Sequence, residues 1–135
     1  MVGIVIIAHG NLAEELLRTT SLIVEQELPS VVSIPITGQE DADEITGLIK
    51  NAIKQADDGD GVVVLTDMFG GTPSNVALSF LIENKVEVIS GVNLPMLLDM
   101  AYSREGRSLA DLAQQLAETG RSNILLASQY LKTGR

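Results

Sequence analysis

Short runs of β-branched and aliphatic residues alternate with longer segments whose apolar residues recur at helical spacing, and this alternation constrains the fold more than any other feature. The strand-like runs are predicted at residues 2–8, 31–36, 61–66 and 86–90, with a final strand predicted at 124–127. Helical stripes are predicted at residues 11–28, at 42–56, in a segment opening at Thr72 and Pro73, at 93–101 and at 109–117. Strands that alternate with helices form a mainly parallel sheet with helices on both faces. The predicted class is therefore a doubly wound α/β fold.

The order of the strands follows from which of them can lie at an edge. Pro35 lacks a backbone N–H, so the strand at 31–36 is expected at an edge of the sheet. The strand at 61–66 is too apolar for an edge, and right-handed crossovers leave few other arrangements. The simplest order is 2-1-3-4, in which the winding reverses between strands 1 and 3. Open α/β sheets bind ligands at such a switch point, outside the carboxyl ends of the strands.

Two helix starts carry capping signals. Asn11, followed three residues later by Glu14, resembles a capping box. Thr72 is a good N-cap residue, and Pro73 is preorganised for the first helical position. We therefore expect helices to begin close behind strand 1 and strand 3.

Length and composition exclude several classes of protein. The 135 residues fit a single domain, 1–135, and two Phe, two Tyr and no Trp require an aliphatic core. A net charge of −9 argues against binding to nucleic acid or to an anionic membrane surface. No cysteine and a single histidine exclude disulfides and thiolate or histidine-rich metal sites, and we expect no metal. Without an apolar run of about 20 residues, the chain is expected in the cytoplasm, not inserted in a membrane.

His9 and Asp67 are the candidate catalytic residues. His9 directly follows strand 1 and Asp67 directly follows strand 3, and adjacent strands lie about 4.8 Å apart, so the two side chains are expected to meet. An aspartate that accepts the Nδ1–H of a histidine leaves Nε2 with its lone pair free. The same carboxylate stabilises positive charge that develops on the ring as Nε2 attacks phosphorus.

A glycine-rich stretch after Asp67 supplies a candidate phosphoryl-binding site. Gly70, Gly71 and Thr72, together with Gly10, are predicted to present backbone N–H groups to the anion. The starts of two helices add their positive dipole ends, so no metal or other cofactor is required. A lone histidine, a capping aspartate or a glycine turn is each most often structural. Their conjunction at one switch point favours phosphoryl transfer.

Three segments resemble the IIA component of the mannose-type (mannose/fructose/sorbose) sugar phosphotransferase system. They are Val-Ile-Ile-Ala-His-Gly at 5–10, Asp-Met-Phe-Gly-Gly-Thr-Pro-Ser-Asn at 67–75 and Gly-Val-Asn-Leu-Pro-Met-Leu at 91–97. The resemblance implies a phosphotransferase subunit in which His9 is phosphorylated at Nε2, Asp67 pairs with it, and Gly71 and Thr72 bind the phosphoryl group. The family also has serine where Thr72 stands.

The resemblance also implies partners. The donor would be the phosphocarrier HPr, charged from phosphoenolpyruvate, and the acceptor a IIB component that passes the group to a sugar the sequence does not specify. Because the sequence stops at Arg135, the IIB partner is expected to be a separate protein or missing. Family members are homodimers that exchange a C-terminal strand, which suits 124–127. The apolar run at 94–98 fits either a dimer surface or the core.

Other functions stay open. The chain could be a stand-alone regulatory phosphoprotein, in which the phosphorylation state of His9 controls partner binding without sugar transport. A second alternative is the related phosphohistidine subunit of dihydroxyacetone kinase, although the 70–73 run is more similar to the mannose type. Histidine phosphatases carry Arg before the catalytic His-Gly, where this chain has Ala8. Receiver domains need an acidic pair after strand 1, which is absent here.

Overall fold

The computed structural model of the protein describes residues 1–133, so the last two residues of the predicted domain, Gly134 and Arg135, lie outside the described residues. Along this range the elements are β1 Gly3–His9, α1 Leu12–Val24, β2 Val31–Ile36, α2 Ala42–Ala56, β3 Val62–Thr66, α3 Gly71–Leu78, β4 Val86–Ser90, α4 Leu94–Ser103, α5 Leu109–Ser122 and α6 Ala127–Thr133. Among residues 1–133, no helix combines the length and the apolarity needed to cross a membrane.

The four strands form one parallel sheet in the order β2-β1-β3-β4, which confirms the predicted doubly wound topology. Pro35 lies in the edge strand β2, opposite Ala8 of β1, where one side of the strand has no neighbour and a missing N–H removes no ladder bond. In this register His9, the last residue of β1, pairs with Ile36, the last residue of β2. The carboxyl ends of these strands therefore meet at one edge of the sheet.

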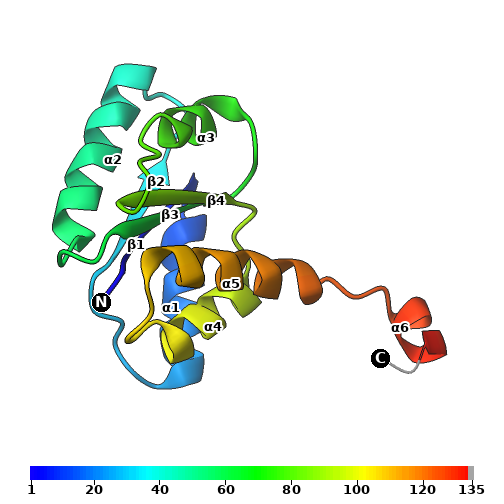
Figure 1. The fold of residues 1–135 in the computed structure, drawn as a ribbon. Helices are drawn as coiled ribbons and strands as arrows, with labels where there is room; N and C mark the ends of the chain where they lie inside the picture. Colours follow the sequence, from blue (N-terminus) through cyan, green and yellow to red (C-terminus); the bar gives the residue numbers. More distant parts are fainter. Residues whose placement is uncertain (134–135) are drawn as a thin grey trace.

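Helices cover both faces of the sheet (Figure 1), with α2 and α3 on one side and α1, α4 and α5 on the other. Alternate residues of β1 serve the two layers: Ile4 and Ile6 pack toward α1, α4 and α5, and Val5 and Ile7 pack toward α2 and α3. All four side chains are fully buried. The strand is apolar without alternation because both of its faces are covered.

Two helices end four or more residues away from the predicted boundaries. The helix α1 ends at Val24, four residues before the predicted end, because Glu25 adopts a left-handed φ of 56° that stops the helix. The helix α5 continues to Ser122, beyond the predicted end at 117.

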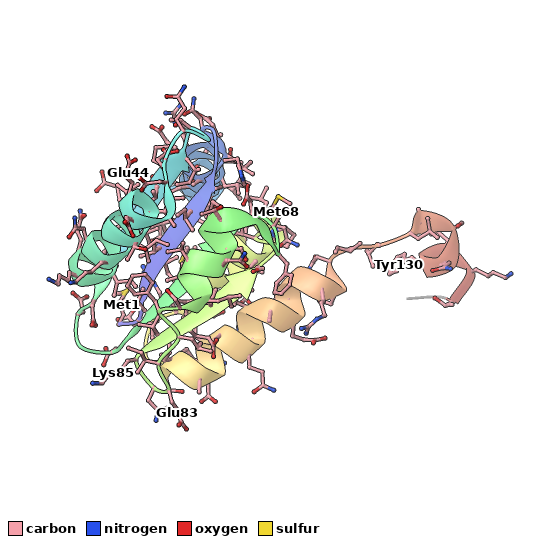
Figure 2. The ribbon with its side chains drawn as sticks, turned by 90° about the horizontal axis from the view of Figure 1, so that it is seen from above. Met1, Glu44, Met68, Glu83, Lys85 and Tyr130 are labelled. Atoms are coloured by element: carbon pink, nitrogen blue, oxygen red, sulfur yellow. The ribbon has the colours of Figure 1, made fainter. Side chains whose placement is uncertain are left out.

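A buried arginine ties the amino edge of the sheet together. The guanidinium of Arg104, which follows α4, donates hydrogen bonds to the carbonyls of Val2 (3.2 Å), Pro29 (2.6 Å) and Ser30 (3.4 Å). Burial lowers the pKa of Arg104, and the charge of Asp58, which works to raise it, only partly offsets this effect. Figure 2 places Met1, Glu83 and Lys85 at this end of the sheet and Met68 at the opposite end.

The prediction of a strand at 124–127 is wrong for the chain taken alone. Residues 124–126 carry no regular structure, and Ala127 begins α6, which stands away from the rest of the chain (Figures 1 and 2). Ile124, Leu125 and Leu126 are 76%, 60% and 62% exposed. A strand forms only where a neighbouring strand satisfies its backbone groups, and this segment leaves α5 without one beside it.

Candidate functional site

The structure brings His9 and Asp67 into direct contact. The ring Nδ1 of His9 lies 2.8 Å from Oδ2 of Asp67, and the backbone N–H of His9 donates to the same oxygen at 3.0 Å. The contact predicted from the strand order is thereby confirmed. A single carboxylate oxygen holds both the main chain and the imidazole of His9, so the ring has one preferred orientation.

The side chains of His9 and Asp67 differ in exposure. The side chain of His9 is 50% exposed, whereas that of Asp67 is 12% exposed. Partial burial works to raise the pKa of Asp67, but the hydrogen bonds from the His9 amide and ring outweigh it, and the net pKa lies below the ordinary value of 3.8. At neutral pH the carboxylate is therefore ionised and only accepts. The neutral ring consequently carries its hydrogen on Nδ1, and Nε2 has the free lone pair.

Helix starts near the site lack the side-chain caps found elsewhere. At α2 the Asp41 side chain accepts the N–H of Glu44 in a full capping box, and at α4 the Asn93 side chain accepts the N–H of Met96. At α1 and α3, which follow β1 and β3, no side chain caps the helix. The first-turn amides of these two helices therefore remain available to an anion.

Both capping predictions near the site are wrong. Asn11 has φ −97° and ψ 13° and forms no capping bond, because its backbone is not in the extended conformation that a capping side chain needs. The N-cap of α3 is Gly70 instead of Thr72, and Gly71 begins the helix, so Pro73 is its third residue. Gly70 and Gly71 have φ values of 89° and 80°, a backbone conformation that favours glycine.

The predicted phosphoryl-binding residues divide into two groups. Gly71 and Thr72 are exposed at the start of α3 and Gly70 is half-buried, so they can meet a ligand that approaches from solvent. The N–H of Gly10, by contrast, donates to the carbonyl of Ile36 at 2.8 Å. That amide is therefore not free for a phosphoryl group, and the contribution of Gly10 is its left-handed turn, with φ +60°, between β1 and α1.

A hydrogen-bonded loop after β2 was not predicted from the sequence. After β2, the carboxylate of Glu40 accepts the backbone N–H groups of Thr37 and Gly38 and the Thr37 hydroxyl, each at 3.0 Å. These bonds, led by that from the Thr37 amide, lower the pKa of Glu40 to about 2. A Thr-Gly turn followed by an acidic residue was the sequence signal for this loop.

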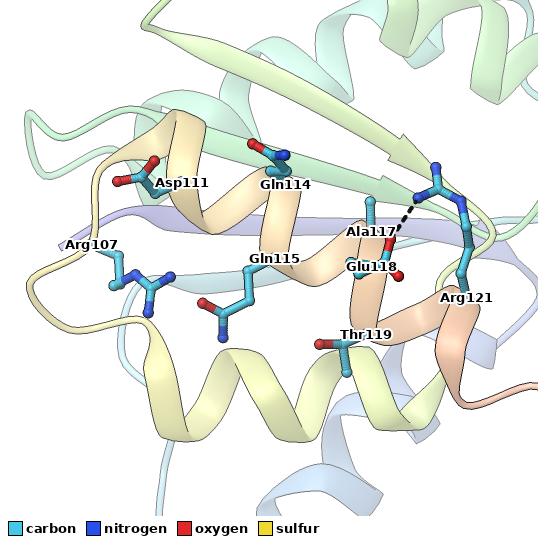
Figure 3. A pocket seen from close by; sticks show the side chains of 8 residues that line it. All are labelled: Arg107, Asp111, Gln114, Gln115, Ala117, Glu118, Thr119 and Arg121. Carbon is cyan, nitrogen blue, oxygen red and sulfur yellow. Dashed lines mark hydrogen bonds and ion pairs between the residues drawn. The ribbon is translucent and has the colours of Figure 1, made fainter. Parts of the chain in front are cut away.

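Two large apolar side chains stand exposed in the loop that carries Asp67. Phe69 is 76% exposed and Met68 is 54% exposed. A groove of about 610 Å³ lies elsewhere, along one face of α5, and its lining includes Arg107, Gln115 and the Glu118–Arg121 ion pair (Figure 3). Its lining includes no residue of the β1–α1 or β3–α3 connection, so it is separate from the histidine site.

Fold and site define a doubly wound α/β protein with a histidine–aspartate pair at the switch point of its sheet. A sequence model of the family described as "PTS system fructose IIA component" matches residues 3–117. The chain belongs to this family, the mannose-type IIA components of sugar phosphotransferase systems, and it is thereby a phosphotransferase component with a phosphoryl-carrier role.

Similar proteins agree with this assignment. The chain is 29% identical over 133 residues to the fructose-specific EIIA component of Bacillus subtilis, covering 98% of this chain and 90% of that protein. It is 34% identical over 126 residues to the mannose-specific EIIAB component of Escherichia coli K12, covering 91% of this chain but only 38% of that longer protein. Among solved structures, the EIIA component from Streptococcus agalactiae superposes with a TM-score of 0.83 at 28% identity, covering 96% of this chain and 99% of the other.

Proposed function

We propose that Nε2 of His9 takes a phosphoryl group from an HPr-like donor protein and passes it to a IIB component. The observation that carries this proposal is the half-exposed imidazole whose Nδ1 is held 2.8 Å from an ionised, mostly buried carboxylate. The Nε2 lone pair forms the new N–P bond while the bond from phosphorus to the donor breaks and its electron pair leaves with the donor. Asp67 stabilises the positive charge that develops on the ring.

The phosphoryl group would be seated by backbone donors. The uncapped first turns of α1 and α3 and the exposed Gly71 and Thr72 support this role, because they offer N–H groups, one hydroxyl and two positive helix ends. Gly70 provides the left-handed turn that opens α3. Such donors neutralise the phosphoryl oxygens without a metal ion or another cofactor.

The surface around His9 supports transfer between proteins. Met68 and Phe69 place exposed apolar area directly beside Asp67, as a docking protein requires at the centre of an interface. The net charge of −9 would speed encounter with a basic partner.

The exposed segment 124–126 supports a homodimer. Its three apolar residues follow α5, and β4 forms an edge of the sheet with one side unpaired. In the proposed dimer this segment lies along the partner's sheet. Deleting residues 124–135 should convert a dimer into a monomer in light scattering, and a full-length chain that is already monomeric would contradict the proposal.

Phosphorylation of the intact protein tests the proposed carrier role. After incubation with phosphoenolpyruvate, enzyme I and HPr, the protein should gain the mass of one phosphoryl group, mapped to His9. The His9→Ala variant should keep its circular dichroism spectrum and gain none, and label retained by that variant would refute the assignment. Transfer of the label onward to a IIB protein distinguishes the carrier from a regulatory phosphoprotein, which would be phosphorylated without passing the group on.

A further inference from the structure

The hydroxyl groups of Thr66, Ser74 and Ser90 form a cluster next to the loop that carries Asp67. Thr66 is fully buried and Ser74 is 2% exposed, and Ser90 is half-buried between them. The Thr66 hydroxyl lies 3.0 Å from Oγ of Ser90 and 3.3 Å from the carbonyl oxygen of Met68. Oγ of Ser74 lies 3.5 Å from Oγ of Ser90. Among the buried residues of an otherwise aliphatic core, such hydroxyls are costly unless they are bonded, so their presence here calls for a reason.

The cluster joins the three elements that converge on the site. Thr66 ends β3 and Ser90 ends β4, opposite each other in register, and Ser74 lies in the first turn of α3. The carbonyl of Thr66 also accepts the N–H groups of Gly91 (2.9 Å) and Val92 (3.0 Å). Thr66 therefore fixes β4 and the following loop through its main chain, and the loop after Asp67 through its side chain.

The contact with Met68 has a direct consequence for Asp67. Asp67 is the single residue between Thr66, held in the sheet, and Met68, whose carbonyl faces the Thr66 hydroxyl. A carbonyl only accepts hydrogen bonds, so the Thr66 hydroxyl is the donor to Met68, and it shares its one hydrogen between that carbonyl and Oγ of Ser90, which can also accept from Ser74. The side chain and the main chain of Thr66 thereby orient the peptide groups on both sides of Asp67.

We infer that Thr66 is a positioning residue for phosphoryl transfer: its hydroxyl fixes the Met68 peptide and so holds the Asp67 carboxylate against Nδ1 of His9. The residue does not touch the reacting atoms. This inference rests on the proposed role of His9. Valine would fill the same volume in a strand that is otherwise Val-Val-Val-Leu, so the hydroxyl of Thr66 serves the loop and not the packing.

Thr66→Val removes the hydroxyl with little change in shape, and Thr66→Ser keeps it. Thr66→Val should lower the maximal rate of phosphoryl uptake from phospho-HPr about three- to tenfold, the rate equivalent of one neutral hydrogen bond, with an unchanged donor KM. Thr66→Ser should recover the rate to within about twofold. Thr20→Val is the matched control, because Thr20 is also fully buried and bonds a carbonyl, that of Leu16, within α1.

The tautomer of His9 gives a readout that does not depend on phosphorylation. In ¹⁵N NMR of the unphosphorylated protein, Thr66→Val should increase the population protonated at Nε2, whereas Thr66→Ser and Thr20→Val should match the wild type. This measurement decides the inference even if the wild type takes up no phosphoryl group, which would refute only the proposed function. Thr66→Ala also removes the hydroxyl, should give a shift in the same direction, and replaces Thr66→Val if that variant does not fold. A wild-type tautomer and rate in Thr66→Val, or a Thr66→Ser variant as slow as Thr66→Val, would overturn the inference.

Discussion

Replacing Asp67 with asparagine separates the charge of this residue from its shape. One oxygen, Oδ2, accepts both the backbone N–H and the Nδ1–H of His9. If the NH₂ group of asparagine replaced Oδ2, it would face two hydrogen-bond donors. The asparagine oxygen must therefore take the position of Oδ2. We therefore expect Asp67→Asn to keep both hydrogen bonds and the Nδ1–H tautomer, and to lose only the negative charge.

The expected loss of rate follows from that charge. A hydrogen bond to a charged acceptor is about twice as strong as one between neutral groups, a difference of about 1 kcal/mol. The lost attraction for a ring that becomes positive lies between about 1 kcal/mol in water and about 4 kcal/mol near a protein surface at 4 Å, and the half-exposed ring of His9 favours the lower part of this range. A total of about 2–3 kcal/mol corresponds to a rate lowered about 30- to 150-fold.

Rapid-quench measurement of single-turnover phosphoryl uptake, over a range of phospho-HPr concentrations, tests this value. The maximal rate of Asp67→Asn should fall while the donor KM stays the same, because the Asp67 side chain contacts the ring and is itself only 12% exposed. Asp67→Ala, which also removes tautomer control, should be about tenfold slower again. An Asp67→Asn rate within threefold of wild type, or an effect confined to KM, would refute the assignment of Asp67 as the charge that supports the reacting ring.

Three further perturbations test the local backbone and hydrogen bonds of the fold. Gly10→Ala should lower the free energy of unfolding, measured in urea, by about 1–2 kcal/mol, because Gly10 has a φ of +60°. Gly47 lies in open space on α2, so Gly47→Ala should raise the free energy of unfolding by about 0.5–1 kcal/mol. Equal effects of the two substitutions would contradict the backbone argument. Arg104→Met should cost about 3 kcal/mol, since three carbonyls lose their donor, and should leave the tautomer of His9 unchanged by NMR. The pKa of Glu40 is lowered from 4.5 to about 2, so its carboxylate contributes stability above pH 4.5 that disappears as the pH falls through 2. The difference in unfolding free energy between wild type and Glu40→Gln should therefore shrink over that pH interval. A difference that grows would contradict the loop geometry.

The strand order and the central pair of the site could be predicted because single residues decide them. Pro35 can lie only where one side of a strand is unpaired, which fixes β2 at the edge and brings β1 beside β3. Once β1 and β3 are neighbours, the residues that follow them, His9 and Asp67, must meet at the carboxyl edge. Both deductions need only the pairing rules of a parallel sheet.

Local backbone conformation could not be predicted in the same way. Asn11 is a preferred N-cap residue, yet its φ and ψ keep its side chain from the first-turn amides, and the donation of the Gly10 amide to Ile36 depends on how two loops pack together. The segment 124–127 has the composition of a strand, but a strand also needs a neighbour, and the chain alone offers none at that place. Composition indicates which secondary structure a segment prefers, whereas the packing around the segment decides which one it adopts.

The position of the single imidazole at one edge of the sheet also limits how many partner proteins can bind at the same time. In the proposed transfer, donor and acceptor both reach the same ring nitrogen from the same side, so the two proteins would exclude each other and no ternary complex would form. The reaction is then of the ping-pong type, and double-reciprocal plots should give parallel lines. Turnover of such a carrier is limited by how fast each partner protein dissociates, which favours weak, short-lived binding over tight binding.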